Sequence, residues 1–230
     1  MLFREEDEDL ELLPFADRAE AGHILASKLV AYSHRRDVLV LGLPRGGVSV
    51  ASAVAGALKV PLDVFVATKL GTPWEQEPAM GAVAEGGVQV LDLSLMKLLG
   101  ISEQEIQEAA AAARKELDSR ISSYRGGRPP LDLKGKTVIL VDDGIATGCS
   151  MLAAIAAIRH KCAARVVVAV PVAPASGCSA IRMEADEFVS VAEPEMFLAV
   201  SQWYRDFAQV SDEDVQRLVQ NAESLMPRAA

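Results

Sequence analysis

The stretch that decides the fold of this chain is Val138-Ile-Leu-Val-Asp142-Asp143-Gly144-Ile145-Ala146-Thr147-Gly148. Its run of apolar residues predicts a buried strand, and two adjacent carboxylates stand at the strand's end. A short glycine-containing loop follows, and a helix is expected from about Gly148 to Arg159. Open α/β sheets bind ligands at this carboxyl end of the strands, so the stretch predicts a fold class and a site together.

The same stretch combines two kinds of binding group. The adjacent carboxylates of Asp142 and Asp143 repel each other, so they need partners such as sugar hydroxyls, a cation or backbone amides. The free N–H groups of the loop and the dipole of the helix form an anion site, to which Thr147 adds a hydroxyl. Acceptors for a diol beside donors for a phosphate match a ribose 5-phosphate. The alternative is that Asp143 merely caps the helix and Thr147 packs the turn, but the full pattern favours the binding site.

Further apolar runs lie on both sides of this stretch and alternate with helical patterns. The runs are Asp37–Gly42, Leu62–Ala67, Arg165–Val170 and Glu187–Val191. One helical pattern begins near Ala16, and another follows the loop Leu43-Pro-Arg-Gly-Gly47 and ends near Leu58. Continuous β-branched runs that alternate with helices indicate βαβ units. We therefore predict an α/β fold with a mostly parallel, Rossmann-like sheet flanked by helices.

An insertion separates the second run from the decisive stretch. Residues 70–80 are irregular and predict a flexible loop, and residues 80–91 predict a hairpin that turns at Glu85-Gly-Gly87. Ser102 and Glu105 form a capping box that starts a long helix, and Ser211 caps a last one. We expect an acidic, flexible N-terminus over residues 1–14 and one domain over residues 15–222.

Composition narrows the class of protein. The chain has 230 residues, with 23 Lys and Arg against 32 Asp and Glu, a formal net charge of −9. This balance argues against a protein that coats nucleic acid or an anionic membrane. Charge-free stretches are too short to span a membrane, the N-terminus lacks a signal-peptide pattern, and 3 cysteines do not suggest a disulfide framework. We expect a cytoplasmic protein with no nucleic-acid or membrane partner.

The decisive stretch resembles the phosphoribosyl pyrophosphate (PRPP) signature of the type I phosphoribosyltransferases, in which apolar residues, two acids and a small loop ending in Thr-Gly follow one another. Leu41–Gly47 looks like the pyrophosphate loop of that family. Lys69–Gly71, Glu77–Gly87 and Trp203-Tyr204 resemble a bacterial branch of unassigned acceptor. The resemblance extends from about Phe15 to Leu218. It implies the type I phosphoribosyltransferase fold, with a small hood formed by about residues 186–210.

The resemblance implies roles for residues at the PRPP site. Asp142 and Asp143 would take the ribose hydroxyls, directly or through Mg²⁺. The 5-phosphate would lie in the loop formed by Gly144, Ile145, Ala146, Thr147 and Gly148. The pyrophosphate would be held by Arg45, the Gly46 and Gly47 amides, and Lys69. Relatives often carry a non-proline cis peptide in the pyrophosphate loop. Asp142, Asp143, Arg45 and Lys69 are thus the candidate catalytic residues, and a homodimer is implied as possible.

The activity implied is Mg²⁺-dependent transfer of phosphoribose from PRPP to a nitrogen acceptor, a nucleobase or related heterocycle, with release of pyrophosphate. The 6-oxopurine enzymes carry an Asp at the position of Ala146 that can act as a base, whereas the adenine enzymes carry alanine. A base from Glu75 or Glu77 would be an alternative. In the hood, Phe197 best matches the ring that stacks on the acceptor, with Trp203 and Tyr204 as further contacts.

Two other functions stay open. The first is a PRPP-binding sensor that has lost turnover, although no nucleic-acid-binding element is visible in the sequence. The second is a different phosphosugar enzyme, such as a phosphatase.

Overall fold

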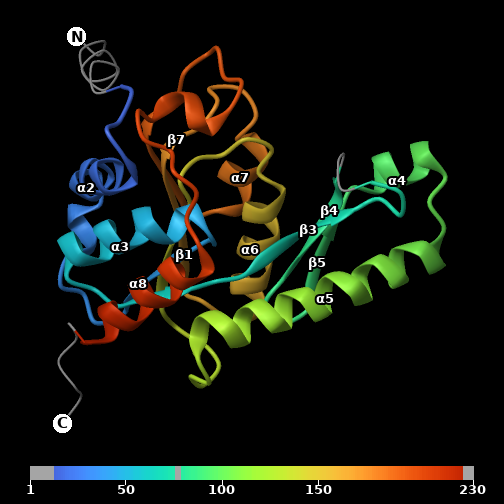
Figure 1. Cartoon of the computed structure of the whole chain (residues 1–230), viewed down its shortest axis with the longest axis horizontal. Helices are drawn as coiled ribbons and strands as arrows, with labels where there is room; N and C mark the ends of the chain where they lie inside the picture. The colour runs from blue at the N-terminus through green and yellow to red at the C-terminus, as the bar shows by residue number, and fades with distance from the viewer. Residues whose placement is uncertain (1–12, 76–78, 225–230) are drawn as a thin grey trace.

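The central sheet is parallel throughout its described length. The computed structural model describes residues 13–75 and 79–224 (Figure 1). Within them a 5-stranded sheet has the order β2-β1-β6-β7-β8. Its strands are β1 (Val38–Gly42), β2 (Leu62–Val64), β6 (Thr137–Val141), β7 (Arg165–Val172) and β8 (Glu187–Ala192). Val40 of β1 lies opposite Leu62 of β2 and Ile139 of β6. The α/β fold with a mostly parallel sheet is confirmed.

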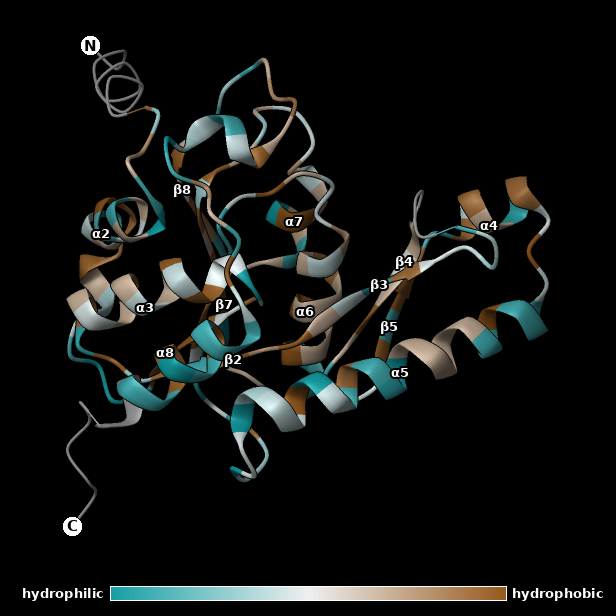
Figure 2. Ribbon diagram, viewed as in Figure 1, coloured by the Kyte–Doolittle hydropathy of each residue, from teal (hydrophilic) through white to brown (hydrophobic). Residues whose placement is uncertain are grey.

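Helices cover both faces of this sheet (Figure 1). The helices α2 (Arg18–Lys28) and α3 (Gly46–Leu58) pack on one face, and α6 (Cys149–His160) and α7 (Ser179–Glu184) pack on the other. Val38 and Val40 of β1 lie in the core on the α3 side, whereas Leu39 and Leu41 lie in the core on the α6 side. Because both faces are buried, each central strand needs apolar side chains throughout, which explains the continuous hydrophobic runs (Figure 2).

The order in which strands are added reverses between β1 and β6. From β1 the chain passes through α3 to β2 on one side, and from β6 it passes through α6 to β7 on the other. Since β1 and β6 are neighbours, the N-termini of α3 and α6 meet at the carboxyl edge of the sheet. Such a switch point is where open α/β sheets bind ligands.

A second, antiparallel sheet forms an arm that projects from the core (Figure 1). It has the order β3-β4-β5, with β3 (Ala67–Gly71), β4 (Ala79–Ala84) and β5 (Val88–Leu91). The short helix α4 (Leu93–Leu99) and the long helix α5 (Glu103–Arg125) complete the arm. The hairpin is confirmed, and so is the capping box, in which Ser102 and Glu105 cap each other's backbone N–H groups at the start of α5.

Three expected boundaries need correction. The expected strand Leu62–Ala67 is divided, because β2 ends at Val64 in the main sheet and Ala67 starts β3 in the arm. The loop expected over residues 70–80 is shorter, since Leu70 pairs with Gly81 and the ends of the range belong to β3 and β4. Residues 76–78, and Glu77 with them, lie outside the described residues. The hood begins after β8, which pairs with β7 as an edge strand of the main sheet.

The C-terminal part of the chain returns to the core. The hood comprises residues 193–210 with the 3-10 helix η2 (Val200–Trp203), and an isolated bridge joins Phe15 to Tyr204. A second short 3-10 helix, η1 (Val30–Tyr32), follows α2. The last described helix is α8 (Asp212–Ser224), as its cap at Ser211 predicts. Most of the expected acidic N-terminus, residues 1–12, lies outside the described residues. Among the helices described, none has the length and apolar character needed to cross a bilayer.

Candidate functional site

Two loops meet at the switch point. They are the turn that leads into α3 and the loop over residues 142–148 that leads into α6. A Cβ placed on Gly46 would lie 1.9 Å from Oδ2 of Asp143, and one on Gly47 would lie 2.7 Å from Oδ1 of Asp142. The loops can approach this closely only because neither residue has a side chain. Gly46 and Gly47, expected to bind pyrophosphate through their amides, therefore lie beside Asp142 and Asp143, which are expected to bind ribose.

The two carboxylates at the end of β6 have different surroundings. Oδ1 of Asp142 accepts the backbone N–H of Asp143 at 2.8 Å. Although Asp142 as a residue is only half-buried, burial of its carboxyl group, together with the charge of Asp143, raises its pKa well above the ordinary value. Oδ2 of Asp143 accepts a hydrogen bond from Nε of Arg18 at 2.8 Å. The two neighbouring carboxylates thus differ in their partners: Asp142 accepts a backbone N–H, and Asp143 accepts a guanidinium.

The loop after the acids presents unpaired backbone donors. The Ile145 N–H donates to the Val172 carbonyl at 3.1 Å, which fixes the loop on β7. Gly148, with φ of 76°, is the N-cap of α6. The N–H groups of Ala146, Thr147 and Gly148 find no hydrogen-bond acceptor among residues 13–75 and 79–224. Ala146 and Thr147 are exposed, so this row of donors at the positive end of α6 is arranged as an anion site would require.

The loop before α3 carries the expected cation Arg45. The Pro44–Arg45 peptide is cis. The Arg45 side chain is 43% exposed, and its Nη1 lies 3.9 Å from Oδ1 of Asp212 at the start of α8. The same Asp212 oxygen accepts the hydroxyl of Tyr124 at 2.7 Å. Arg45 therefore precedes Gly46 and Gly47 in the sequence, but its side chain extends toward α8 and not toward the acidic pair.

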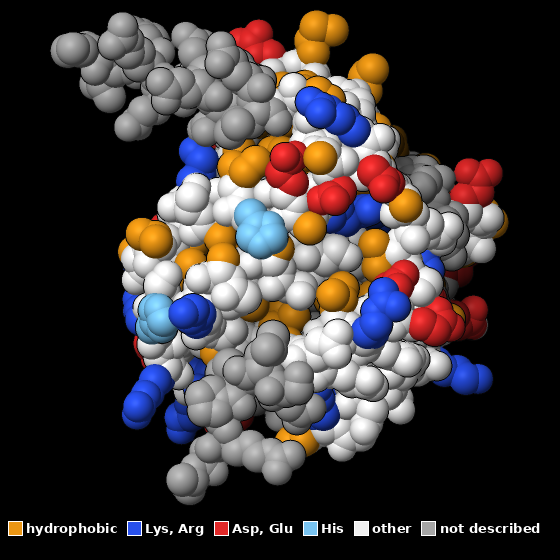
Figure 3. Space-filling model, turned by 60° about the vertical axis from the view of Figure 1, so that its left-hand side comes forward, with side chains coloured by type: hydrophobic (Ala, Val, Ile, Leu, Met, Phe, Trp, Pro, Cys, Tyr) orange, Lys and Arg blue, Asp and Glu red, His pale blue; other side chains and the backbone are white. Residues whose placement is uncertain are grey.

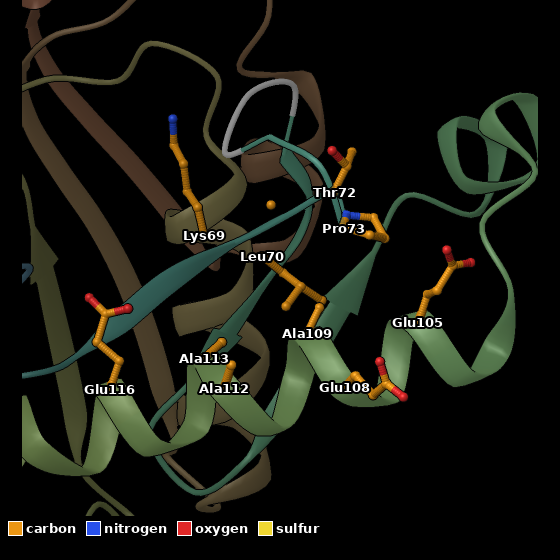
Figure 4. Close-up of a pocket in the computed structure, with 11 residues that line it drawn as sticks. Lys69, Leu70, Thr72, Pro73, Glu105, Glu108, Ala109, Ala112, Ala113 and Glu116 are labelled. Carbon is orange, nitrogen blue, oxygen red and sulfur yellow. The ribbon is translucent and has the colours of Figure 1, made fainter.

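The second expected cation, Lys69, lies on the arm. Its side chain and that of Leu70 point to opposite sides of β3, and Leu70 faces α5 (Figure 4). A cavity of about 330 Å³ lies between β3, the following loop and α5, with carboxylates of Glu105, Glu108 and Glu116 along α5 (Figure 4). Lys69 lines this cavity, but no residue of the loops at 44–47 or 142–148 does. The cavity is thus separate from the site at the switch point.

The hood places its aromatic residues in two groups. The rings of Phe197 and Trp203 are stacked, with centroids 6.2 Å apart, and both side chains keep part of their surface exposed. Tyr204 is buried between Phe15 and Phe207, and its hydroxyl donates to the Asp143 carbonyl at 2.6 Å. Phe197 and Trp203 keep partly exposed rings, whereas Tyr204 joins the hood to the acidic pair.

Sequence reasoning missed Arg18, which the fold brings to Asp143 from 125 residues away. Its guanidinium also donates to the Ala208 carbonyl at 2.8 Å and lies 3.8 Å over the ring of Phe207. One signal could have pointed to it. Arg18 is the first residue of α2, after the N-cap Asp17, and a cation is unfavourable at that positive end of a helix dipole.

The donors present fit Mg²⁺ only together with a ligand. In the described part of the chain no three His, Cys, Asp or Glu side chains are grouped as a metal site. Asp142 and Asp143 therefore offer carboxylates but not a full shell. Mg²⁺ is usually held by one or two carboxylates plus substrate phosphates and water, so these residues suit a cation that arrives with a phosphorylated substrate.

These features define the class of protein: an open, parallel α/β protein whose switch point offers two carboxylates beside a helix N-terminus with unpaired backbone donors among the described residues. Comparison with known families gives the particular family. The phosphoribosyl transferase domain matches residues 16–208, and the chain belongs to the phosphoribosyl transferase family.

Several relatives share most of this chain. Two Mycobacterium tuberculosis proteins, from strains CDC 1551 and H37Rv, bear names that infer a phosphoribosyl transferase. Each is 42% identical to this chain over 201 residues. The match covers 87% of this chain but 45% of each relative, so the chain spans about half their length. The crystal structure of the Thermus thermophilus protein TT1426 is 42% identical, covers 90% of this chain and 98% of that one, and has a TM-score of 0.77.

Proposed function

We propose that this chain transfers the phosphoribosyl group of PRPP to a nitrogen acceptor, a nucleobase or related heterocycle, and releases pyrophosphate. The observation that carries the proposal is the row of unpaired N–H groups over residues 146–148 beside the carboxylates of Asp142 and Asp143. One group of donors suits a phosphate, and the adjacent acceptors suit a diol. The family gives the reaction class, and this geometry supports the substrate.

In the proposed complex, residues 144–148 bind the 5-phosphate, and Asp142 and Asp143 bind the ribose hydroxyls. The amides of Gly46 and Gly47, in the first turn of α3, bind the pyrophosphate. Arg45 would have to turn away from Asp212, a contact at 3.9 Å between exposed groups that contributes little. Mg²⁺ bound with PRPP would neutralise pyrophosphate charge. The chain's own work is orientation of the reactants and stabilisation of the leaving group, with Lys69 as a further cation.

Acceptor binding is proposed at the hood. Phe197 and Trp203 offer partly exposed rings on which a flat heterocycle can stack. Tyr204 would hold the hood in place rather than stack on the acceptor, since its ring packs on Phe15 and Phe207 and its hydroxyl donates to the Asp143 carbonyl. Ala146 supplies no base. Glu75 is exposed in the loop after β3 and is the described candidate for that role.

The experiment is a pyrophosphate-release assay with PRPP, Mg²⁺ and a panel of purine, pyrimidine and small heterocyclic acceptors. The proposal expects release with one acceptor class and its loss in the double variant Asp142→Asn, Asp143→Asn. Binding of PRPP by calorimetry without release from any acceptor would favour a PRPP sensor instead. Failure of the wild-type chain to bind PRPP at all would overturn both.

We further propose that the chain works in the cytoplasm as a homodimer, without nucleic-acid or membrane partners. The net charge of −9 supports the lack of polyanionic partners. On the upper part of the face in Figure 3, acidic and basic side chains are intermixed. The homodimer follows from the family resemblance, and sedimentation velocity tests it: a single monomeric species at micromolar concentration would contradict it.

A further inference from the structure

The guanidinium of Arg18 bridges the acidic pair and the hood. Nε donates to Oδ2 of Asp143 at 2.8 Å, and Nη1 donates to the carbonyl of Ala208 at 2.8 Å. The same group lies 3.8 Å over the ring of Phe207 and 5.9 Å from that of Tyr204. The Arg18 side chain is 11% exposed, so nearly all of it is committed to these contacts.

Local structure gives no reason for an arginine here. Arg18 is the first residue of α2, where the helix dipole disfavours a cation. Burying a guanidinium costs free energy, and a buried ion pair repays this cost only partly. An apolar residue could pack on Phe207 without that cost. The interactions that favour arginine at this position are therefore the two directional ones, to Asp143 and to Ala208.

Arg18 also reaches the point where the two ligand-binding loops meet. A Cβ on Gly46 would lie 1.9 Å from Oδ2 of Asp143 and 2.9 Å from Nε of Arg18. Gly46, the Asp143 carboxylate and the Arg18 guanidinium are thus packed closely together. A change in the direction of the Asp143 carboxylate would disturb all three.

We propose that Arg18 is a positioning residue that fixes the Asp143 carboxylate for PRPP binding. Through Arg18, the orientation of this carboxylate depends on whether the hood is packed against the core. This inference rests on the proposed function. Arg18 holds Oδ2, so Oδ1 is directed to the ribose hydroxyls or to the cation that accompanies the substrate. Because one planar guanidinium serves both Asp143 and Ala208, movement of the hood moves the carboxylate, and the acceptor-binding and PRPP-binding elements respond together.

The hood carries its own reporter. The chain has 2 Trp residues, and Trp203 lies in the hood with its ring on Phe197. Trp74 is 64% exposed on the arm, so Trp74→Phe removes the second signal at little structural cost. Acrylamide quenching of Trp203 then reports hood seating without any ligand, and calorimetry with PRPP and Mg²⁺ reports the site.

The test compares Arg18→Met and Arg18→Lys in the Trp74→Phe background. Methionine keeps the apolar stem and removes both donors, so quenching should rise and PRPP affinity should fall by roughly tenfold or more, as loss of a charged hydrogen bond implies. Lysine keeps a point charge but lacks the planar fork. It should restore most of the PRPP affinity while quenching stays high. The control Arg205→Met removes an exposed hood arginine and should leave both readouts unchanged.

The outcomes separate this inference from the proposed function. Asp143→Asn without ligand should raise Trp203 quenching as Arg18→Met does, and this arm needs no PRPP. If wild type fails to bind PRPP but both variants loosen the hood, the proposed function fails and the coupling of Asp143 to the hood stands. Wild-type PRPP affinity in Arg18→Met would overturn the positioning role. Equal losses in both readouts for the methionine and lysine variants would assign Arg18 to structure alone. If Arg18→Met does not fold, the lysine variant and Asp143→Asn decide.

Discussion

The Asp143 carboxylate packs directly against the backbone of Gly46 across the switch point, in the space that a side chain at residue 46 would fill. Oδ2 of Asp143 lies 1.9 Å from the position that a Cβ of residue 46 would take, a distance that atoms which are not bonded to each other do not adopt. The contact joins the N-terminus of α3 to the loop after β6. It therefore sets how close the proposed pyrophosphate and ribose subsites can be.

Gly46→Ala should push these two loops apart. We expect a loss of about 1–3 kcal/mol in stability, as overpacking typically costs, together with loss of measurable PRPP binding. The matched control is Gly56→Ala in the same helix, where a Cβ would meet no atom within 4 Å apart from its chain neighbours and the surrounding helix backbone. That change should stabilise the protein by about 0.5–1 kcal/mol, since alanine is the better helix former. Urea unfolding and calorimetry provide the two measurements. Equal stabilities of the two variants would refute the contact.

Tyr204→Phe should separate a hood role from a purely structural one. The change removes the hydroxyl that donates to the Asp143 carbonyl at 2.6 Å, with an expected stability loss of about 1 kcal/mol. PRPP binding should weaken by roughly two- to fivefold, because the carbonyl belongs to the loop proposed to bind the 5-phosphate. Tyr32→Phe is the control: its hydroxyl donates to Glu187 at 2.5 Å, at the amino end of β8. It should lose stability but keep wild-type PRPP affinity by calorimetry, and similar affinities for both variants would contradict the assignment.

The arm is joined to the core by a buried ion pair at its base. Arg125, at the end of α5, donates to Asp63 of β2 at 3.1 Å, and both side chains are nearly inaccessible. Arg125→Met leaves a buried carboxylate without its partner, so urea unfolding should show a loss of about 3–5 kcal/mol. The double variant with Asp63→Leu should recover much of that loss.

An exposed pair in the same helix is the control for the buried one. Arg120 contacts Glu116 at 2.6 Å, with both side chains about half exposed. Arg120→Met should cost less than about 1 kcal/mol, because solvent screens such pairs. If Arg125→Met and Arg120→Met lost equally little stability, the ion pair between Asp63 and Arg125 would not stabilise the junction between the arm and the core.

Glu85 should make stability depend on pH. Burial raises the pKa of this carboxyl, and Lys161, with Nζ 3.7 Å from Oε1, offsets part of the effect. Its other oxygen is buried and has no hydrogen-bond partner among the described residues. The folded state therefore holds the proton more tightly than the unfolded state. Its stabilising effect is present below the ordinary Glu pKa of about 4.3 and is lost as pH rises through the folded value.

Glu85→Gln removes this dependence. The variant should gain stability over wild type as pH rises above the ordinary Glu pKa of about 4.3, and should keep a constant advantage above the raised pKa of the folded state. Asp142, whose pKa is raised in both proteins, cancels in the difference. Urea unfolding at several pH values measures the difference, and a gap that does not change with pH would show that Glu85 titrates as an ordinary surface carboxyl.

The short helix α4 and Arg18 show where sequence reasoning stopped. In α4, Leu93 is 71% exposed and Leu98 is 81% exposed, so its leucines do not form the single apolar stripe from which an amphipathic helix is predicted. Arg18 stands where a helix dipole disfavours a cation, but its partners Asp143 and Ala208 are 125 and 190 residues away, so its own segment does not identify them. Neither feature leaves a periodic signal in its own segment.

The sequence by itself determined the parallel sheet and the loop after β6, because hydrophobic runs, adjacent acids and glycine spacing are local properties of the chain. It also pointed to the Gly46 and Gly47 turn. Only the tertiary structure decided that the run from Leu62 to Ala67 is shared between two sheets. It alone placed Arg18 on Asp143, committed Tyr204 to the acidic loop and turned Arg45 toward α8. Those outcomes depend on which distant segments pack together, and the free energy of such contacts is not written in any single stretch of residues.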